Sequence, residues 1–472
     1  MRFSAVATAD RLLPESLAMR LKPFLDRIDT TIFSPEDRTN AGRTSLTAFI
    51  IRVSSALIAL FSQVLMARWM GGFEYGIFVL VWTTMLIAGN LSCLGFHTSI
   101  VRFIPQYRVQ GALAELRGIL QTSHALVLGL SLLIAAAGIA GIWLFHDHFE
   151  SYYIIPFYLG MICLPMIAIS DTIEGTARAN SWAILALAPI YILRPVLILA
   201  LMALAMFLDY PHTGQTAMVC AILATLITTV WQALSILPRV ANEVRQVQPK
   251  WRLREWILVS FPIFLIEGFV FILTNADVLM VGWFMEPHDV AIYFATVKIL
   301  ALVHFVYFSV KAGAAQRYAE YFEHDDQQRL GDFARATVSW TFWPSVAMAI
   351  CVLIIGKPML MLFGPDFDGG YPLLFVLVLG VLARASVGPA ESLLTMTGGQ
   401  NVCAAIYAGA LLLNVGLNII LIPSLGLWGA AVGMVAAMVF EALLLALIVW
   451  KKLGIAMVIS LKRRPAAGEV QW

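Results

Sequence analysis

The sequence contains few charged residues for its length. Only 13% of its 472 residues are Asp, Glu, Lys or Arg, and 60% are hydrophobic, whereas a soluble protein carries about 25% charged residues. Length alone would favour two or three soluble domains. However, apolar runs recur from about residue 45 to residue 450. The scarcity of charge therefore argues against a soluble enzyme and indicates an integral membrane protein.

Cysteine and cofactor motifs are also scarce. The five cysteines all lie in apolar runs, and no two have metal-ligand spacing: Cys93, Cys163, Cys220, Cys351 and Cys403. Small buried residues in membrane helices explain this pattern. The sequence has no phosphate-binding loop, zinc pattern or nucleophile elbow. We therefore expect no disulfide, no metal, no cofactor and no nucleic-acid partner.

The sequence does contain apolar runs long enough to cross a bilayer. A membrane helix needs about 20 apolar residues to cross a hydrocarbon core about 30 Å thick, and lipid excludes open strands. The sequence therefore predicts an all-α polytopic membrane protein with about twelve transmembrane helices in two pseudo-symmetric six-helix lobes. The predicted spans are 45–68, 75–95, 118–145, 153–175, 183–207 and 215–237, then 257–283, 290–311, 336–363, 371–396, 401–422 and 427–450.

The basic residues alternate along the chain. Most of the 31 Lys and Arg residues fall in the N-terminal tail, in every second loop and in the C-terminal tail. Because basic loops stay in the cytoplasm, we expect a bacterial inner-membrane protein with both termini cytoplasmic. The predicted domains are a basic N-terminal tail, an N-lobe, a basic linker, a C-lobe and a C-terminal tail: 1–44, 45–237, 238–256, 257–450 and 451–472.

The two predicted lobes share short stretches of sequence. Gln63–Trp69 (QVLMARW) is similar to Asp277–Trp283 (DVLMVGW), and Arg102 aligns with Arg317 at nearly the same offset. Six spans per half give both halves the same orientation. The pattern therefore predicts a parallel repeat, with its pseudo-two-fold axis along the membrane normal and a cleft between the lobes.

The same stretches resemble a known family. The chain is similar to the polysaccharide-biosynthesis (oligosaccharide flippase) family of the multidrug/oligosaccharidyl-lipid/polysaccharide exporter superfamily. The residues that carry the resemblance are ARWMGGFEYGIF (Ala67–Phe78), GFHTSIVRFIPQY (Gly95–Tyr107), NADVLMVGWF (Asn275–Phe284) and IPSLGLWGAAVG (Ile422–Gly433). The resemblance implies a V-shaped transporter that moves undecaprenyl-diphosphate-linked glycans by alternating access. The family's lipid II flippases usually have fourteen spans, whereas twelve are predicted here.

Ionisable residues inside the predicted spans are candidate functional residues, because each costs about 2.5–3.5 kcal/mol at a helix centre. Four cations are candidate ligands for a substrate diphosphate: Arg194, Arg52, Lys298 and Arg384. Arg194 falls near the middle of its span, although a buried ion pair would also explain it. Arg52 could equally extend to the cytoplasmic headgroups.

Three acids are candidates for coupling transport to Na⁺ or H⁺: Glu267, Asp277 and Glu441. Asp277 and Lys298 are predicted at similar depth, so a purely structural ion pair between them is an open alternative. Arg384 and Glu391 are seven residues apart, which places them on one face if their helix is continuous.

The leading functional hypothesis is a flippase for a lipid-diphosphate-linked oligosaccharide in surface polysaccharide biosynthesis, such as that of lipopolysaccharide or exopolysaccharide. Its expected partners are that lipid-linked substrate, membrane lipids and a coupling ion. A cation-coupled multidrug extruder of the same fold is the main alternative. A membrane glycan polymerase or ligase is less favoured, because such enzymes need a substantial periplasmic loop and the predicted periplasmic loops are short. We therefore expect a transporter and not an enzyme.

Overall fold

The computed structural model describes residues 37–324 and 326–459, with side chains from Ile51 onward except those of Arg52 and Val53. Most of the predicted tails 1–44 and 451–472 lies outside this range. The described chain is helical almost throughout, which confirms the all-α prediction. Its helices are α3 (Asp37–Ser92), α4 (Phe96–Val109), α5 (Leu113–Leu144), η1 (His146–His148), α6 (Ser151–Ala179), α7 (Ala183–Ala188), η2 (Pro189–Leu193), α8 (Arg194–Phe207), α9 (Gly214–Val244), α10 (Leu253–Phe284), α11 (Pro287–Glu323), α12 (Gln327–Phe363), η3 (Pro365–Gly370), α13 (Tyr371–Ala385), α14 (Ala390–Met396), α15 (Gln400–Leu425) and α16 (Leu427–Leu453).

Eleven segments of the described chain are long and apolar enough to cross a membrane. The first, Ser54–Val109, is 56 residues long and folds back on itself at Gly71. Gly71 has a φ of 77°, a conformation that favours glycine. Beyond it, the Tyr75 hydroxyl donates a hydrogen bond of 2.6 Å to Gln63, although twelve residues of straight helix span about 18 Å. This segment therefore supplies two passages, in agreement with the predicted total of about twelve.

Several boundaries differ from the predicted ones because glycine and proline interrupt the helices. The predicted span 75–95 ends at Ser92, and a turn at Gly95 (φ 75°) leads into α4, which the sequence analysis treated as loop. The predicted span 183–207 is divided by the π-helical turn η2. There the Arg194 N–H donates a hydrogen bond to the Pro189 carbonyl, five residues back, instead of to the carbonyl four residues back as in an α-helix. The neighbouring prolines have no N–H with which to donate such a bond.

The predicted span 371–396 is likewise interrupted. Helix α13 ends at Ala385, and α14 begins only at Ala390. Between them Gly388 has a φ of 57°, and Pro389 cannot continue the backbone ladder. Arg384 and Glu391 are therefore on different helices, which corrects the expectation that they share one continuous face.

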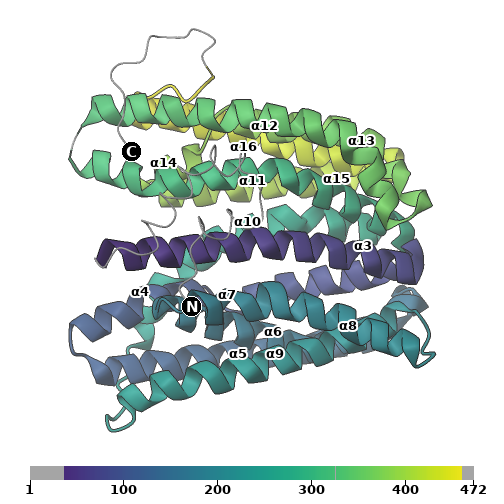
Figure 1. Cartoon of the computed structure of the whole chain (residues 1–472), viewed down its shortest axis with the longest axis horizontal. Helices are drawn as coiled ribbons and strands as arrows, with labels where there is room; N and C mark the ends of the chain where they lie inside the picture. The colour runs from purple at the N-terminus through teal and green to yellow at the C-terminus, as the bar shows by residue number, and fades with distance from the viewer. Residues whose placement is uncertain (1–36, 325, 460–472) are drawn as a thin grey trace, which may run out of the picture.

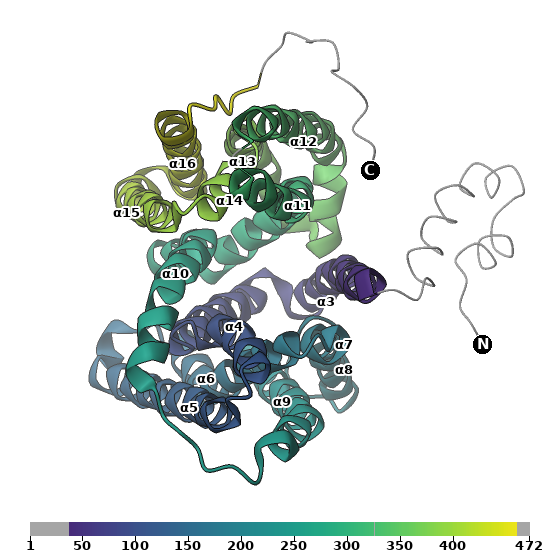
Figure 2. The same cartoon turned by 90° about the vertical axis from the view of Figure 1, so that its left-hand side faces the viewer.

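The helices form two groups with α3 and α10 between them (Figures 1 and 2). The first group comprises α4–α9 and the second comprises α11–α16. Viewed from the end in Figure 2, α10 passes from beside α4 and α5 towards α15. Its early residue Trp256 donates a hydrogen bond of 2.8 Å to the Tyr107 hydroxyl on α4. Helix α10 therefore contacts both groups.

Candidate functional site

A cavity of about 190 Å³ lies between α10 and the second group, with walls from α10, α11, α13, α15 and α16. Its polar lining includes Lys298, His304, Arg384, Asn414 and Glu441. Apolar residues such as Phe308 complete the wall. A mostly apolar cavity with a few convergent polar groups is the usual form of a small-molecule site.

Lys298 is the most available cation of this cavity. Its side chain is exposed, although it lies in the middle of an apolar helix. Its ammonium nitrogen is 4.6 Å from the centre of the Phe294 ring, and within the described residues it makes no ion pair. A cation held over an aromatic face without a carboxylate can accept an anionic ligand.

Arg384 is a less available cation, because it already has an acidic partner. Its Nε lies 3.2 Å from Glu441 Oε1, and their side chains are 15% and 2% exposed. The guanidinium also stacks on Tyr307, at 4.7 Å from the ring centre. Glu391 pairs elsewhere, with Lys311 at 2.8 Å. The predicted candidates Arg384 and Glu441 are thus brought together as a buried ion pair.

Asp277 is buried beside the cavity and is held by two amides. Its Oδ1 accepts hydrogen bonds of 2.8 Å from Asn414 and 2.7 Å from Asn418, both on α15. The described residues show no ion pair between Asp277 and Lys298. The sequence analysis missed both asparagines. Their spacing of four residues inside an apolar run was the available signal, because it places two amides on one helix face.

Arg194 lies in the first group, away from this cavity. It is 3% exposed, and its Nη2 donates a hydrogen bond of 2.8 Å to Ser170 on α6. Ser170 in turn donates one of 2.7 Å to Gln232 on α9. No ion pair of Arg194 occurs in the described part of the chain. The side chain of Arg52 lies outside the described residues, so the structure does not place it.

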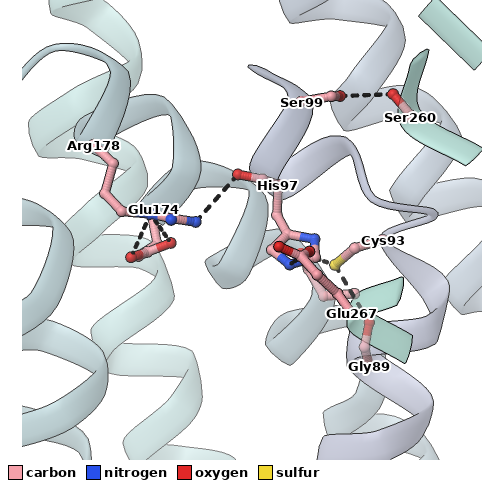
Figure 3. Close-up of polar contacts among 9 residues, drawn as sticks. Gly89, Cys93, His97, Ser99, Glu174, Arg178, Ser260 and Glu267 are labelled. Atoms are coloured by element: carbon pink, nitrogen blue, oxygen red, sulfur yellow. Dashed lines mark hydrogen bonds and ion pairs between the residues drawn. The ribbon is translucent and has the colours of Figure 1, made fainter. Parts of the chain in front are cut away.

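Glu267 faces the first group and does not line the cavity. Its Oε2 is 3.3 Å from His97 Nε2, a contact between α10 and α4 that Figure 3 shows. The sequence analysis did not select His97. It lies directly after the Gly95 turn, and only the fold brings it to α10.

The two groups also meet where α3 reverses. Arg68 donates hydrogen bonds of 2.5 Å and 3.2 Å to the carbonyls of Leu362 and Met361 at the end of α12. Close by, Gly76 packs directly on the Pro287 carbonyl, which leaves no room for a side chain. Helix α3 is therefore joined to α11 and α12 of the second group at this end of the molecule.

The profile of the polysaccharide biosynthesis protein family matches residues 42–315, more than half of the chain. The chain belongs to this family. The MatE family profile also matches, over residues 262–420. No curated protein matches the chain.

Solved structures share the fold of this polysaccharide biosynthesis protein. An inward-facing multidrug resistance MATE family transporter of the MOP superfamily has a TM-score of 0.68 at 16% identity, over 86% of this chain and 98% of that one. The lipid II flippase MurJ in an inward closed conformation has a TM-score of 0.66 at 15% identity, over 86% and 87%. An outward-facing MATE transporter gives 0.56 at 15% identity, over 86% and 95%. The family match and the eleven apolar segments of the described chain identify a multi-pass membrane protein of the polysaccharide biosynthesis family, with a fold similar to that of these solved transporters.

Proposed function

We propose that this transporter is a flippase that moves a lipid-diphosphate-linked oligosaccharide across the bacterial inner membrane for surface polysaccharide biosynthesis. The family match over residues 42–315 carries the proposal. Lys298 supports it, because an unpaired cation beside an apolar cavity suits a diphosphate. MurJ, which is named a lipid II flippase, has a similar fold.

The substrate moves by alternating access between two lobes, 45–237 and 257–450, with both termini in the cytoplasm. Lys298 contacts the diphosphate first, and Arg384 contributes when its ion pair with Glu441 loosens. Arg194 and Arg52 add positive charge on the side of the N-lobe. The lipid tail stays in the bilayer, because moving each CH₂ group of an isoprenoid chain from an apolar environment into water costs about 0.8 kcal/mol of free energy.

Asp277 is the best-placed residue for ion coupling. Both amides donate N–H bonds to Asp277 Oδ1, so the buried carboxylate itself is the group that would take up Na⁺ or H⁺. Asp277 also touches the substrate cavity through Asn414, which lines it. Ion binding there and substrate binding at Lys298 are therefore adjacent events. Glu441 and Glu267 are secondary candidates for the same role.

A second function, cation-coupled multidrug extrusion, is favoured by the MatE match over residues 262–420. In that case the ion pair of Arg384 and Glu441 would open to present a carboxylate to a cationic drug. The two functions predict opposite phenotypes when the gene is deleted.

The deletion experiment separates the two functions. A flippase predicts loss of surface polysaccharide, accumulation of lipid-linked repeat units shielded from a periplasmic modifying enzyme, and unchanged tolerance to cationic dyes. A multidrug extruder predicts normal polysaccharide and raised dye sensitivity. Lipid-linked intermediates are extracted and tested for protection. If they are absent while surface glycan is intact, the flippase proposal is wrong.

A further inference from the structure

The cavity beside α10 extends along α11 and has two ends with different side chains. Lys298 and Phe308 both line it, and the ten residues between them span about 15 Å of helix. Helix α16 runs between the same two ends. Its Met434 accepts a hydrogen bond from Tyr293, which lies shortly before Lys298, whereas Glu441 is about 11 Å farther along the helix. The cavity is therefore elongated, with Lys298 towards one end and Glu441 towards the other.

The second end, here called the glutamate end, is formed by Arg384, Tyr407 and Glu441 with Phe308 beside them. Arg384 lies over the Tyr307 ring, and the rings of Tyr307 and Phe308 meet edge to face with their centres 5.7 Å apart. Tyr407 and Glu441 are each 1% exposed, whereas Phe308 is 53% exposed. The glutamate end thus combines buried polar groups with an open aromatic face.

Three polar atoms of the glutamate end have no hydrogen-bond partner among the described residues: Arg384 Nε, Glu441 Oε1 and Tyr407 Oη. The first two form an ion pair at 3.2 Å, but not in the orientation of a hydrogen bond. The Tyr407 hydroxyl has the carboxylates of Glu391 and Glu441 as electrostatic neighbours, without the geometry of a hydrogen bond to either. Because buried polar atoms normally have partners, these three are available to a ligand that enters the cavity.

The available atoms include both donors and acceptors. A guanidinium donates hydrogen bonds, a carboxylate accepts them and a phenol does both. A diphosphate only accepts, and the charge of Glu441 repels it. A sugar hydroxyl both donates and accepts, and the apolar C–H face of a sugar ring can pack on an aromatic ring such as that of Phe308. The glutamate end therefore matches the chemistry of a sugar and not that of a phosphate.

We propose that the glutamate end is a sugar-binding subsite, which holds the sugar attached to the diphosphate while the diphosphate contacts Lys298. The proposal rests on the proposed function and deepens it, because it assigns the saccharide part of the substrate to named residues. Tyr407 and Glu441 bond to ring hydroxyls, and Phe308 packs on the ring. Arg384 keeps its ion pair with Glu441 during this contact. The two ends of the cavity thus recognise two parts of one substrate.

Matched ligands test the subsite on the full-length protein in nanodiscs. Geranyl diphosphate carries the diphosphate without a sugar, and its glycosylated forms carry one glucose, galactose, N-acetylglucosamine or N-acetylgalactosamine. Calorimetric titration gives the dissociation constant of each ligand. We expect at least one glycosylated form to bind about tenfold more tightly than geranyl diphosphate. A tenfold ratio corresponds to about 1.4 kcal/mol, the contribution of one or two hydrogen bonds.

Three variants determine which residues produce this ratio. Tyr407→Phe removes a hydroxyl and is expected to reduce the ratio of the two affinities from about tenfold to about twofold. Phe308→Leu is expected to reduce it similarly, and because Phe308 is half exposed the substitution spares the packed interior. Lys298→Ala is expected to weaken the binding of both ligands and to leave their ratio at about tenfold.

Two controls repeat the same chemical changes outside the cavity. Tyr318→Phe removes a hydroxyl that bonds to Thr337 at 2.6 Å, and Phe305→Leu removes an exposed ring from α11. Neither residue lines the cavity, so both variants should keep the tenfold ratio. A ratio near one for all four sugars in the wild-type protein, or a ratio that both Tyr407→Phe and Phe308→Leu leave unchanged, overturns the proposal.

This measurement and the deletion experiment fail separately. A ratio near one removes the sugar subsite but leaves the flippase proposal intact, because that proposal is tested by the deletion phenotype. If the deletion phenotype is absent while the ratio depends on Tyr407, the flippase proposal is wrong and the sugar subsite stands.

Discussion

Lys298 and Arg384 both line the cavity, yet their surroundings give them different roles. Arg384 is neutralised by Glu441 at 3.2 Å, whereas Lys298 lies over the Phe294 ring and, among the described residues, has no carboxylate partner. A diphosphate would have to displace a carboxylate to reach Arg384. It would gain a new charge-assisted contact at Lys298 without such a cost. The free cation is therefore the stronger ligand candidate.

Substituting Lys298 tests this difference. Lys298→Ala should lower the transport rate of the lipid-linked oligosaccharide by about tenfold or more, since a hydrogen bond to a charged group contributes about 1.5–3 kcal/mol. Lys298→Arg should retain most of the rate, because it keeps the charge. Transport is measured as the fraction of labelled substrate that becomes accessible outside proteoliposomes.

Lys357→Ala is the control for this prediction. Lys357 is an exposed lysine on α12 that lies 3.8 Å from Asp368 and does not line the cavity. The Lys357→Ala protein should transport the substrate at the wild-type rate. Normal transport by a well-folded Lys298→Ala protein would exclude Lys298 from the substrate site.

The sequence allowed most of the site's ionisable residues to be proposed, but not their partners. Depth along a helix can be counted from the sequence, and on that basis Asp277 and Lys298 looked like a pair. The directions in which the two side chains point depend on how α10, α11 and α15 pack against one another. In the structure Asp277 accepts hydrogen bonds from Asn414 and Asn418 instead, and Lys298 makes no ion pair within the part of the chain that the structure describes.

Among the elements, α12 has an unusual C-terminal cap. The last carbonyls of a helix lack partners within it, and here two of them accept hydrogen bonds from Arg68 on α3. This cap does not come from the neighbouring stretch of chain but from α3, which is nearly 300 residues earlier in the sequence. Separating α3 from α12 must break it.

Removing this cap should loosen the end where α3 reverses. Arg68→Ala removes two hydrogen bonds to the carbonyls of α12, and each such bond contributes about 0.5–1.5 kcal/mol of stability. The substitution therefore favours separation of α3 from α12. The expected result is faster labelling of a His288→Cys reporter by a membrane-impermeant maleimide, because His288 packs on Gly72 at this boundary.

Arg68→Lys should give an intermediate labelling rate, since an ammonium can still donate to one carbonyl. The same reporter in an otherwise wild-type background sets the reference rate. Equal labelling rates with and without Arg68 would show that the cap does not hold the boundary closed.

Helix positions followed from apolar runs, but helix interruptions did not. The predicted number of about twelve spans agrees with the eleven long apolar segments of the described chain, the first of which reverses at Gly71, because about 20 apolar residues are needed for each crossing. It did not predict α4 or the π-helical turn at Pro189–Leu193, whereas Pro389 did indicate a kink beside the break at Gly388. Such interruptions depend on whether neighbouring helices satisfy the freed backbone groups, and a single sequence does not contain that information.

For the whole molecule, the charge pattern predicts a definite topology. Cysteines introduced at Glu286, Asp366 and Leu425 should react from the periplasm, and those at Lys250 and Gln327 only from the cytoplasm. The measurement is impermeant labelling of intact cells and of inverted vesicles. One site that reacts from the wrong side would break the alternation of basic loops on which the orientation depends.

Helix α10 also affects how the protein is made. Its early contacts, such as Trp256 with Tyr107, involve residues that the ribosome has already released. Asp277, however, can form its hydrogen bond with Asn414 only after 137 further residues have been synthesised. At 5–20 residues per second this takes roughly 7–27 s. During synthesis α10 can therefore dock on the finished first half while its buried carboxylate still lacks its amide donors.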